Sequence, residues 1–288
     1  MRRGGRGRDL AFMLLAGLGV CLALLPMLVL VGDVVLDGMG KISLHFLSSF
    51  ASRFPERAGI RAPLAGTLWL LGLTAVLAVP VSVGAAIYLE EYATRTWFTR
   101  MVRANITNLA GVPSIVYGIL GLALFVRAMD LGRSVISGAL TLSFLILPII
   151  IVATQEALRR VPKGVREAAY GLGATRWEVI RFQVLPQAIP GILSGVILAL
   201  ARAAGETAPL IMVGAVTFIA FTPEAATDPY TALPVQIFHW VTRSQDGFRG
   251  LAAAGIIVLL TLILSLNGLA VILRNRLEKG EMMENGKA

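Results

Sequence analysis

The sequence has little of the chemistry that enzymes and disulfide-bonded domains need. It contains one cysteine, Cys21, so no disulfide can form within the chain. Its two histidines, His45 and His239, stand alone, and no His, Cys, Asp or Glu residues have metal-ligand spacing. No Ser/His/Asp arrangement is present, and no nucleotide-binding P-loop, because the Gly-Lys pairs at 40–41 and 286–287 are not followed by Ser or Thr. We therefore expect no catalytic residue, no metal site and no cofactor in this chain.

Charge is also scarce. Charged residues make up 15% of the 288 residues, whereas 56% are hydrophobic and the mean hydropathy is +0.77, which is too apolar for an ordinary water-soluble domain. The apolar runs are about 20 residues or longer, as a membrane-crossing helix requires, whereas barrel strands would be about ten residues long and alternating. We predict an all-α polytopic membrane protein with six transmembrane helices. The predicted spans are residues 10–31, 63–89, 105–126, 134–155, about 189–208, and 250–273.

The chain is basic, with a formal charge of +9, and the positions of its basic residues explain why. With the N-terminus in the cytoplasm, 17 of the 26 Lys and Arg residues fall in cytoplasmic segments, eight in outer segments, and Arg202 within a span. This distribution follows the positive-inside rule and requires no nucleic acid, so both termini are expected to be cytoplasmic. A secretory signal is the alternative for the basic N-terminus, but the apolar run after it exceeds the roughly 7–15 residues of a signal core.

The six spans are expected to form one transmembrane domain over residues 1–288. Residues 1–62 hold the first span and an outer loop with a short interfacial helix, and residues 63–276 hold the remaining spans. Residues 156–187 form a cytoplasmic loop in which apolar residues recur at helical spacing on either side of Gly171 and Gly173. Two short helices joined by a glycine turn are expected there.

The most informative stretch is residues 182–223, which contain only two charged residues, Arg202 and Glu206, four positions apart. A charge at hydrocarbon depth costs about 2.5–3.5 kcal/mol, so it is retained mainly where it faces protein, water or another charge. In a helix the two residues would lie about 6 Å apart on one face and could pair. Small residues at every fourth position from 191 to 207 form a neighbouring ridge that lets another helix approach. The charges should therefore border a helix interface.

Two interpretations of this pair compete. It can be a structural ion pair that joins helices. Alternatively, the Arg202 guanidinium can bind the oxygens of an anion such as phosphate or a carboxylate, with Glu206 holding or releasing it. The depth of Arg202 also has two solutions. If Pro209 ends the fifth span, Arg202 lies toward the outer face and residues 210–221 form a re-entrant or interfacial segment, whereas a span over about 198–218 puts Arg202 nearer the cytoplasm.

The third span is rich in polar residues around Gly111 and Pro113. Polar side chains in such a span more often join helices to each other than contact a ligand. Ser114 and Tyr117, three positions apart on one face, are nevertheless candidates for lining a path.

The cytoplasmic loop carries a pattern of residues at fixed spacing. Its members are Glu167, Ala168, Ala169, Gly173, Gln183, Leu185 and Pro186. The pattern resembles the EAA loop of ABC importer permeases, in which a short coupling helix docks into a cytoplasmic ATPase and the glycine allows the turn. Gln183 departs from the family pattern, which usually has an aliphatic residue there. An amphipathic loop on the membrane surface would have a similar composition, but the matches at fixed spacing favour the resemblance.

Two other segments read GVPSIVYG over residues 111–118 and RAAGETAP over residues 202–209, and YLEEY follows the second span at 88–92. Together they resemble the permeases of the Pst phosphate importer. The Glu-Thr-Ala-Pro form, with LPVQI at 233–237, is more similar to the A-type permease of that importer than to its C-type partner.

This resemblance implies a type I ABC importer permease fold in the bacterial cytoplasmic membrane, surrounded by lipid. It implies three partners: a second permease of the PstC type, a homodimeric PstB-type ATPase that binds ATP and Mg²⁺, and an extracytoplasmic phosphate-binding protein of the PstS type. Permeases for sulfate or molybdate, and a non-transporting scaffold or sensor, are the alternatives. The implied pathway residues are Arg202, Glu206, Thr207, Ser114 and Tyr117, and the implied ATPase-coupling residues are Glu167, Ala168, Ala169, Gly173, Leu185 and Pro186.

Overall fold

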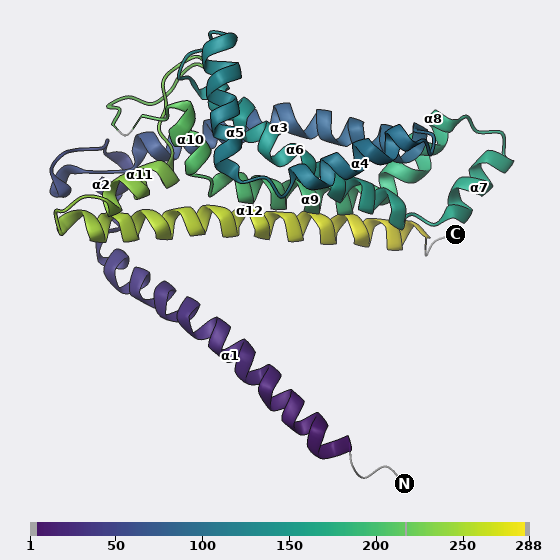
Figure 1. Cartoon of the computed structure of the whole chain (residues 1–288), viewed down its shortest axis with the longest axis horizontal. Coiled ribbons are helices and arrows are strands. Elements are labelled where there is room, and N and C mark those ends of the chain that lie inside the picture. The colour runs from purple at the N-terminus through teal and green to yellow at the C-terminus, as the bar shows by residue number, and fades with distance from the viewer. Residues whose placement is uncertain (1–4, 217, 286–288) are drawn as a thin grey trace.

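The protein is described by a computed structural model that covers residues 5–216 and 218–285, with side chains over 12–216 and 218–276. Within these ranges the regular structure is entirely helical and no strand occurs, which confirms the predicted all-α class (Figure 1). Short 3₁₀ or π segments (η) adjoin the α-helices. The elements are α1 Gly5–Gly38, η1 Met39–Lys41, α2 Leu44–Ser48, η2 Pro55–Arg57, α3 Arg61–Ile87, η3 Tyr88–Tyr92, α4 Trp97–Leu109, α5 Ser114–Gly121, η4 Leu122–Ala128, α6 Val135–Arg160, α7 Lys163–Gly171, α8 Arg176–Val179, η5 Ile180–Val184, α9 Leu185–Ala204, α10 Ala208–Val213, α11 Leu233–Val241 and α12 Gly247–Asn285.

Five helical stretches are long and apolar enough to cross a membrane. They are Phe12–Lys41, Arg61–Tyr92, Val135–Arg160, Arg176–Ala204 and Gly247–Arg276. The bent pair of α4 with α5 and η4 passes the same test when its two halves are taken together, which gives up to six spans. The predicted six spans agree with the structure when this pair is counted as one.

The third span is not the continuous helix that was predicted over residues 105–126. α4 ends at Leu109, α5 begins at Ser114, and the two helices meet at an angle of 102°. The cause is local, because Pro113 has no backbone N–H to donate and disfavours helical backbone at Val112 before it. Consequently α5 stands out from the bundle, whereas α4 lies along it (Figure 1).

α6 is the central helix of the bundle. It packs against α3 and against α9, and α9 in turn packs against α12 (Figure 1). Leu145, Ile146 and Ile150 of α6 share one buried cluster with Ala199 and Ala203 of α9. Since lipid tails are as apolar as these side chains, close packing between the helices holds them together more than removal of apolar surface from water does.

The fifth span starts earlier and ends earlier than predicted. α8, η5 and α9 run on as one helical stretch, so the second short helix predicted for the cytoplasmic loop is the beginning of this span. The stretch stops at Ala204, ahead of Pro209, which lies instead in the first turn of α10, where a missing N–H is tolerated. Among the described residues of the predicted re-entrant segment 210–221, which exclude residue 217, only the part up to Val213 is helical.

α1 leaves the bundle (Figure 1). It contacts α12 near its C-terminal end, where Gly38 lets the two backbones approach at Ala253. Its side chains from residue 12 to residue 30 are exposed and largely apolar. In a membrane such a surface faces lipid or another chain. The predicted short helix of the outer loop is α2, whose Phe46 is buried beside Trp240.

Candidate functional site

Arg202 lies in the last turn of α9. Its Nε is 3.6 Å from Glu206 Oε1, so the predicted pair forms, although Glu206 lies beyond the end of the helix and not on its face. The two charged groups form an ion pair, but the distance between them is too long for a strong hydrogen bond. The Arg202 side chain is 51% exposed, whereas that of Glu206 is 15% exposed. The guanidinium therefore keeps donors free for a ligand or a partner chain.

The end of α9 explains this placement. The Gly205 N–H donates to the Arg202 carbonyl at 3.1 Å and the Glu206 N–H donates to the Ala203 carbonyl at 3.2 Å, so the last turn tightens and stops. Arg202 thus lies at the negative end of the helix dipole, a favourable place for a cation. Because α9 stops here, Arg202 lies at the α10 end of the span, far along the chain from the start of the span at Arg176.

The small-residue ridge of α9 packs against α6, as predicted. A Cβ on Gly191 would come within 2.8 Å of the Ala157 Cβ, and a Cβ on Gly195 would collide with the Ala153 Cβ. Only glycine therefore permits this approach of the two helices.

The next ridge of α9 has Ser194, Leu198 and Arg202 at every fourth position, and Leu198 and Arg202 are exposed whereas Ser194 is half-buried. Ser194 and Leu198 line a groove of about 500 Å³ between α6 and α9. Leu198 is 64% exposed, and the half-exposed Arg202 follows it by one turn. Arg202 does not line the groove, but it lies one turn beyond Leu198 on the same side of α9.

The two segments that resemble phosphate permeases pack against each other. α5 begins within the first segment, residues 111–118, and α10 begins within the second, residues 202–209. The two helices are in contact. A Cβ on Gly118 would lie 2.6 Å from the Pro209 Cα and 2.9 Å from the Met212 Cβ. Gly118 therefore allows a helix contact that a larger residue would prevent.

The remaining predicted pathway residues lie around this contact. The Tyr117 hydroxyl donates to the Leu109 carbonyl at 2.8 Å, across the bend between α4 and α5. The buried Tyr117 ring belongs to the same cluster as Ala203 of α9. Ser114, the first residue of α5, and Thr207, which precedes α10, are both half-buried. The structure thus gathers these residues near one end of α9, with Tyr117 in a structural role and Arg202 as the most exposed of them.

The predicted coupling residues lie on and after α7. Glu167 and Ala168 are exposed, Ala169 is half-buried, and Gly173 makes the turn after the helix with φ of +86°. Leu185 is half-buried at the start of α9, and Pro186 is exposed beside it.

Large apolar side chains near these coupling residues are exposed on the surface of the chain. Leu172 is 91% exposed, Phe182 is 61% exposed and Trp177 is 54% exposed. α7 and α8 lie at the same end of the bundle as the C-terminal end of α12 (Figure 1). An exposed apolar surface of this kind is typical of a protein docking site.

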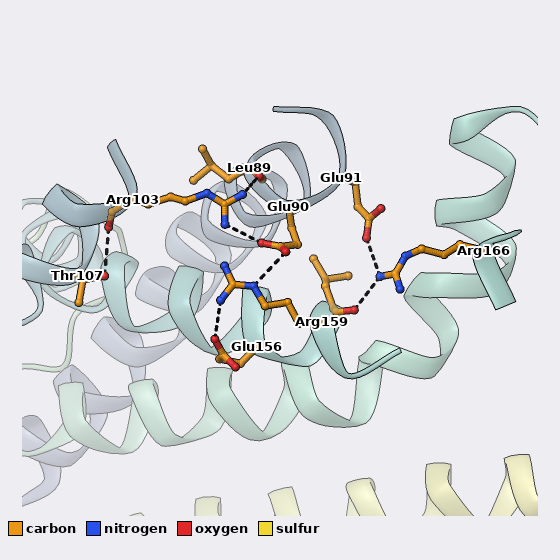
Figure 2. Close-up of polar contacts among 9 residues, drawn as sticks. Leu89, Glu90, Glu91, Arg103, Thr107, Glu156, Arg159 and Arg166 are labelled. Carbon is orange, nitrogen blue, oxygen red and sulfur yellow. Dashed lines mark hydrogen bonds and ion pairs between the residues drawn. The ribbon is translucent and has the colours of Figure 1, made fainter. Parts of the chain in front are cut away.

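A network of charges that the sequence analysis did not predict connects this loop to the helices (Figure 2). Glu90, in η3 at the end of α3, accepts from Arg103 of α4 at 2.8 Å and from Arg159 of α6 at 3.0 Å. Arg159 also pairs with Glu156 at 2.9 Å. One carboxylate therefore joins three helices.

Glu91 extends the network to the coupling helix. It accepts from Arg166 of α7 at 2.9 Å, and Arg166 also donates to the carbonyls of Leu158 and Val161 at the end of α6. Both partners of the Glu91 pair are largely buried, with side-chain exposures of 10% and 18%. The sequence signal was the pair of acids in YLEEY, which follows an apolar run and faces an arginine-rich loop, but one sequence does not show which arginine pairs with which acid.

The class of this chain follows from comparison with known families. The profile of the family described as "Binding-protein-dependent transport system inner membrane component" matches residues 78–279, and the chain belongs to this family. It is therefore a multi-pass protein of the cytoplasmic membrane and a component of a transport system.

Several relatives of this chain are named as phosphate transport permeases of the PstA type, which confirms the predicted resemblance. The chain is 39% identical over 197 residues to the phosphate transport system permease protein PstA 1 of Mycobacterium tuberculosis, covering 67% of this chain and 64% of that protein. It is 35% identical over 257 residues to PstA of Mycobacterium leprae, covering 86% and 81%. It is 35% identical over 212 residues to PstA of Yersinia pestis, covering 74% and 71%.

Solved structures support the fold. A chain of a bacterial alginate ABC transporter matches with a TM-score of 0.63 at 17% identity, covering 92% of this chain and 93% of that one. A chain of the MetNI methionine ABC transporter matches with a TM-score of 0.61 at 17% identity, covering 76% and 97%. The chain has the fold of type I ABC importer permeases.

Proposed function

We propose that this chain is a permease subunit of an ATP-driven importer of inorganic phosphate, in which it forms half of the translocation pathway and docks one ATPase subunit. The observation that carries the proposal is the half-exposed Arg202, held at the end of α9 with donors to spare, beside a close contact between the two segments that resemble phosphate permeases. A planar guanidinium presents paired donors that suit two oxygens of a phosphate.

The open face of α9 supports a pathway shared with a second chain. The stripe from Ser194 to Arg202 faces away from the chain's own core, so a related permease of the PstC type would complete its wall. Thr207 and Ser114 border this pathway, and Tyr117 fixes the bend that places α5. Glu206 orients Arg202 and releases it when an anion arrives.

The proposed ATPase dock is the loop of α7 and α8, where Leu172, Trp177 and Phe182 are exposed. A homodimeric ATPase of the PstB type would bind ATP and Mg²⁺ and receive this loop in a groove. A phosphate-binding protein of the PstS type would deliver the anion at the opposite end of the bundle. In this orientation both termini of the chain lie in the cytoplasm.

The first test is phosphate uptake in bacterial cells that lack their own high-affinity importer. Arg202→Ala should lower uptake at least about tenfold, because a charge-assisted contact contributes roughly 1.5–3 kcal/mol. Arg202→Lys should recover only part of the rate, since an ammonium lacks the fork of donors. Arg100→Ala, at an exposed position of α4, is the matched control. Uptake near the wild-type rate by Arg202→Ala protein that is present in the membrane would remove the pathway role.

A further inference from the structure

A second cluster of arginine lies at the α10 end of the molecule, outside the residues discussed above. Arg127, in the last turn of η4, and Arg133, just before α6, line one cavity of about 420 Å³. The rest of its wall is apolar or backbone, from Leu122 and Val126 on one side and Ile211 to Val216 on the other. Among the residues that the structure describes, no acidic side chain lines this cavity.

The two guanidinium groups are the donors available in this cavity. Among the described residues, neither Arg127 nor Arg133 makes an ion pair or a side-chain hydrogen bond. The backbone amides nearby are already used, because Gly214 and Ala215 donate to the Leu210 carbonyl at 3.1 and 2.9 Å and Val216 donates to Tyr230 at 2.8 Å. An anion that enters would therefore be held by the arginines.

The first amides of α6 are used as well. Val135 donates to the Asp228 carbonyl at 3.0 Å and Ile136 donates to the Ala226 carbonyl at 2.8 Å. The helix terminus beside Arg133 can therefore add a favourable dipole but few free donors.

Local structure positions both arginines. The turn between them is fixed by a hydrogen bond from Leu131 N–H to the Phe125 carbonyl at 3.1 Å and by one from the Ser137 hydroxyl to the Gly132 carbonyl at 2.8 Å. Gly214 has φ of +101°, and a Cβ there would lie 2.6–2.9 Å from the Cδ, Cγ and Nε of Arg133. Glycine at 214 thus gives the Arg133 side chain its place across the end of α10.

The cavity also continues the proposed pathway. Its walls are η4, which extends α5, and the C-terminal end of α10, and these are the two helices that meet at Gly118 and Pro209. The opposite end of α10 begins at Ala208, two residues after Glu206. A ligand in the cavity would therefore lie one short helix away from Arg202.

We propose that Arg127 and Arg133 form an outer binding site for a phosphate group, which receives the anion before it reaches Arg202. Two unpaired guanidiniums over an apolar wall suit a tetrahedral oxyanion, since each presents several donors and neither charge is neutralised by the protein. The phosphate group could belong to free phosphate or to a lipid headgroup, and free phosphate is the proposed ligand. This inference rests on the proposed function for the identity of the anion and for the outward orientation of the cavity.

The test is equilibrium binding of radioactive inorganic phosphate to the assembled two-permease importer in nanodiscs of zwitterionic lipid. Arg127→Ala with Arg133→Ala should remove one class of phosphate sites, or raise its dissociation constant about tenfold for each arginine lost. Arg202→Ala should retain that class. Arg57→Ala removes another exposed arginine from the same end of the molecule, and phosphate binding should not change. A second set of nanodiscs contains phosphatidylglycerol, and the amount of this lipid retained by each purified variant is measured.

Phosphate binding by the double variant that equals the wild type would overturn the site. Loss of retained phosphatidylglycerol with unchanged phosphate binding would assign the site to lipid and overturn its place on the pathway. The proposed function is tested by a different measurement, because it fails if the wild-type importer accumulates no phosphate. Binding to the outer site is measured without ATP or transport, so the two failures can be told apart.

Discussion

At the scale of single residues, Arg202 is held loosely by its own chain. Its contact with Glu206 is 3.6 Å long and half of its side chain is exposed, although it is the one charged residue of α9. A buried structural ion pair would be shorter and better enclosed, since removing two charges from water is offset only by good geometry. The geometry therefore favours a charge that is kept for a ligand or a partner over one that locks helices together.

Gly118 permits the contact between the two motif segments, and its replacement should show how much the site depends on that contact. Gly118→Val places side-chain atoms against Pro209, so we expect a loss of stability of about 1–3 kcal/mol and loss of phosphate uptake. Thermal unfolding of the purified protein in detergent and uptake in cells measure the two effects.

Gly72→Val is the control for this experiment. Gly72 lies within α3 and has open space where a Cβ would be added, so the change in helix propensity is the same without the collision. If both valine variants behaved alike, the close approach at Gly118 would have no special importance.

At the scale of elements, the charge network gives α7 a firm connection to the spans. Arg166 of α7 is tied to Glu91, and the adjacent Glu90 is tied to α4 and α6 (Figure 2). α4 leads through the bend to α5, which packs on α10 beside the candidate pathway. If an ATPase docks on α7 as proposed, a displacement of α7 could pass through these ion pairs and then through the backbone from α4 to α5 to the candidate pathway.

Glu90→Gln should weaken this route. The variant loses the charge that faces both Arg103 and Arg159, and we expect phosphate uptake to fall severalfold while ATP hydrolysis by the assembled importer persists. The ratio of phosphate transported to ATP hydrolysed, measured in proteoliposomes, reports the coupling.

Glu156→Gln is the matched control, because it removes one contact from the same Arg159 at a position whose side chain is 55% exposed. Exposed pairs contribute little, typically 0–1 kcal/mol. An unchanged ratio in Glu90→Gln, or an equal loss in both variants, would count against transmission through Glu90.

The elements differ in how far they could be predicted. Long apolar runs identify α3, α6 and α12, because a bilayer requires about 20 apolar residues in a helix. The sequence shows Gly111 and Pro113, which can disturb a helix, but it does not predict the 102° angle between α4 and α5. Proline can either kink a membrane helix or end it. The end of α9 at Ala204 was also missed, because Pro209 is the stronger helix breaker in the sequence but is tolerated in the first turn of α10.

Only part of the candidate site could be predicted from the sequence. Arg202 and Glu206 stand out as the only charges in a long apolar stretch, so composition alone finds them. Glu90, Arg103 and Arg159 do not stand out, because each lies among other charges near the end of a span. Their pairing depends on how α3, α4 and α6 pack, which is tertiary information.

At the scale of the whole molecule, the chain is built to work with others. α1 exposes apolar side chains along its length, the open stripe of α9 faces away from the core, and apolar side chains near α7 point into solvent. Under the proposed function each surface has a different neighbour: lipid or protein for α1, a second permease for α9 and an ATPase for α7. Transport by the isolated chain is therefore not expected.

The most direct test of the central claim is substrate selectivity of the assembled importer in sealed proteoliposomes, with ATP on the ATPase side and the loaded binding protein on the other. We predict ATP-dependent accumulation of phosphate by the wild type, loss of accumulation in Arg202→Ala, and no competition by sulfate or molybdate. Accumulation of sulfate or molybdate in place of phosphate, or phosphate accumulation that does not depend on Arg202, would contradict it.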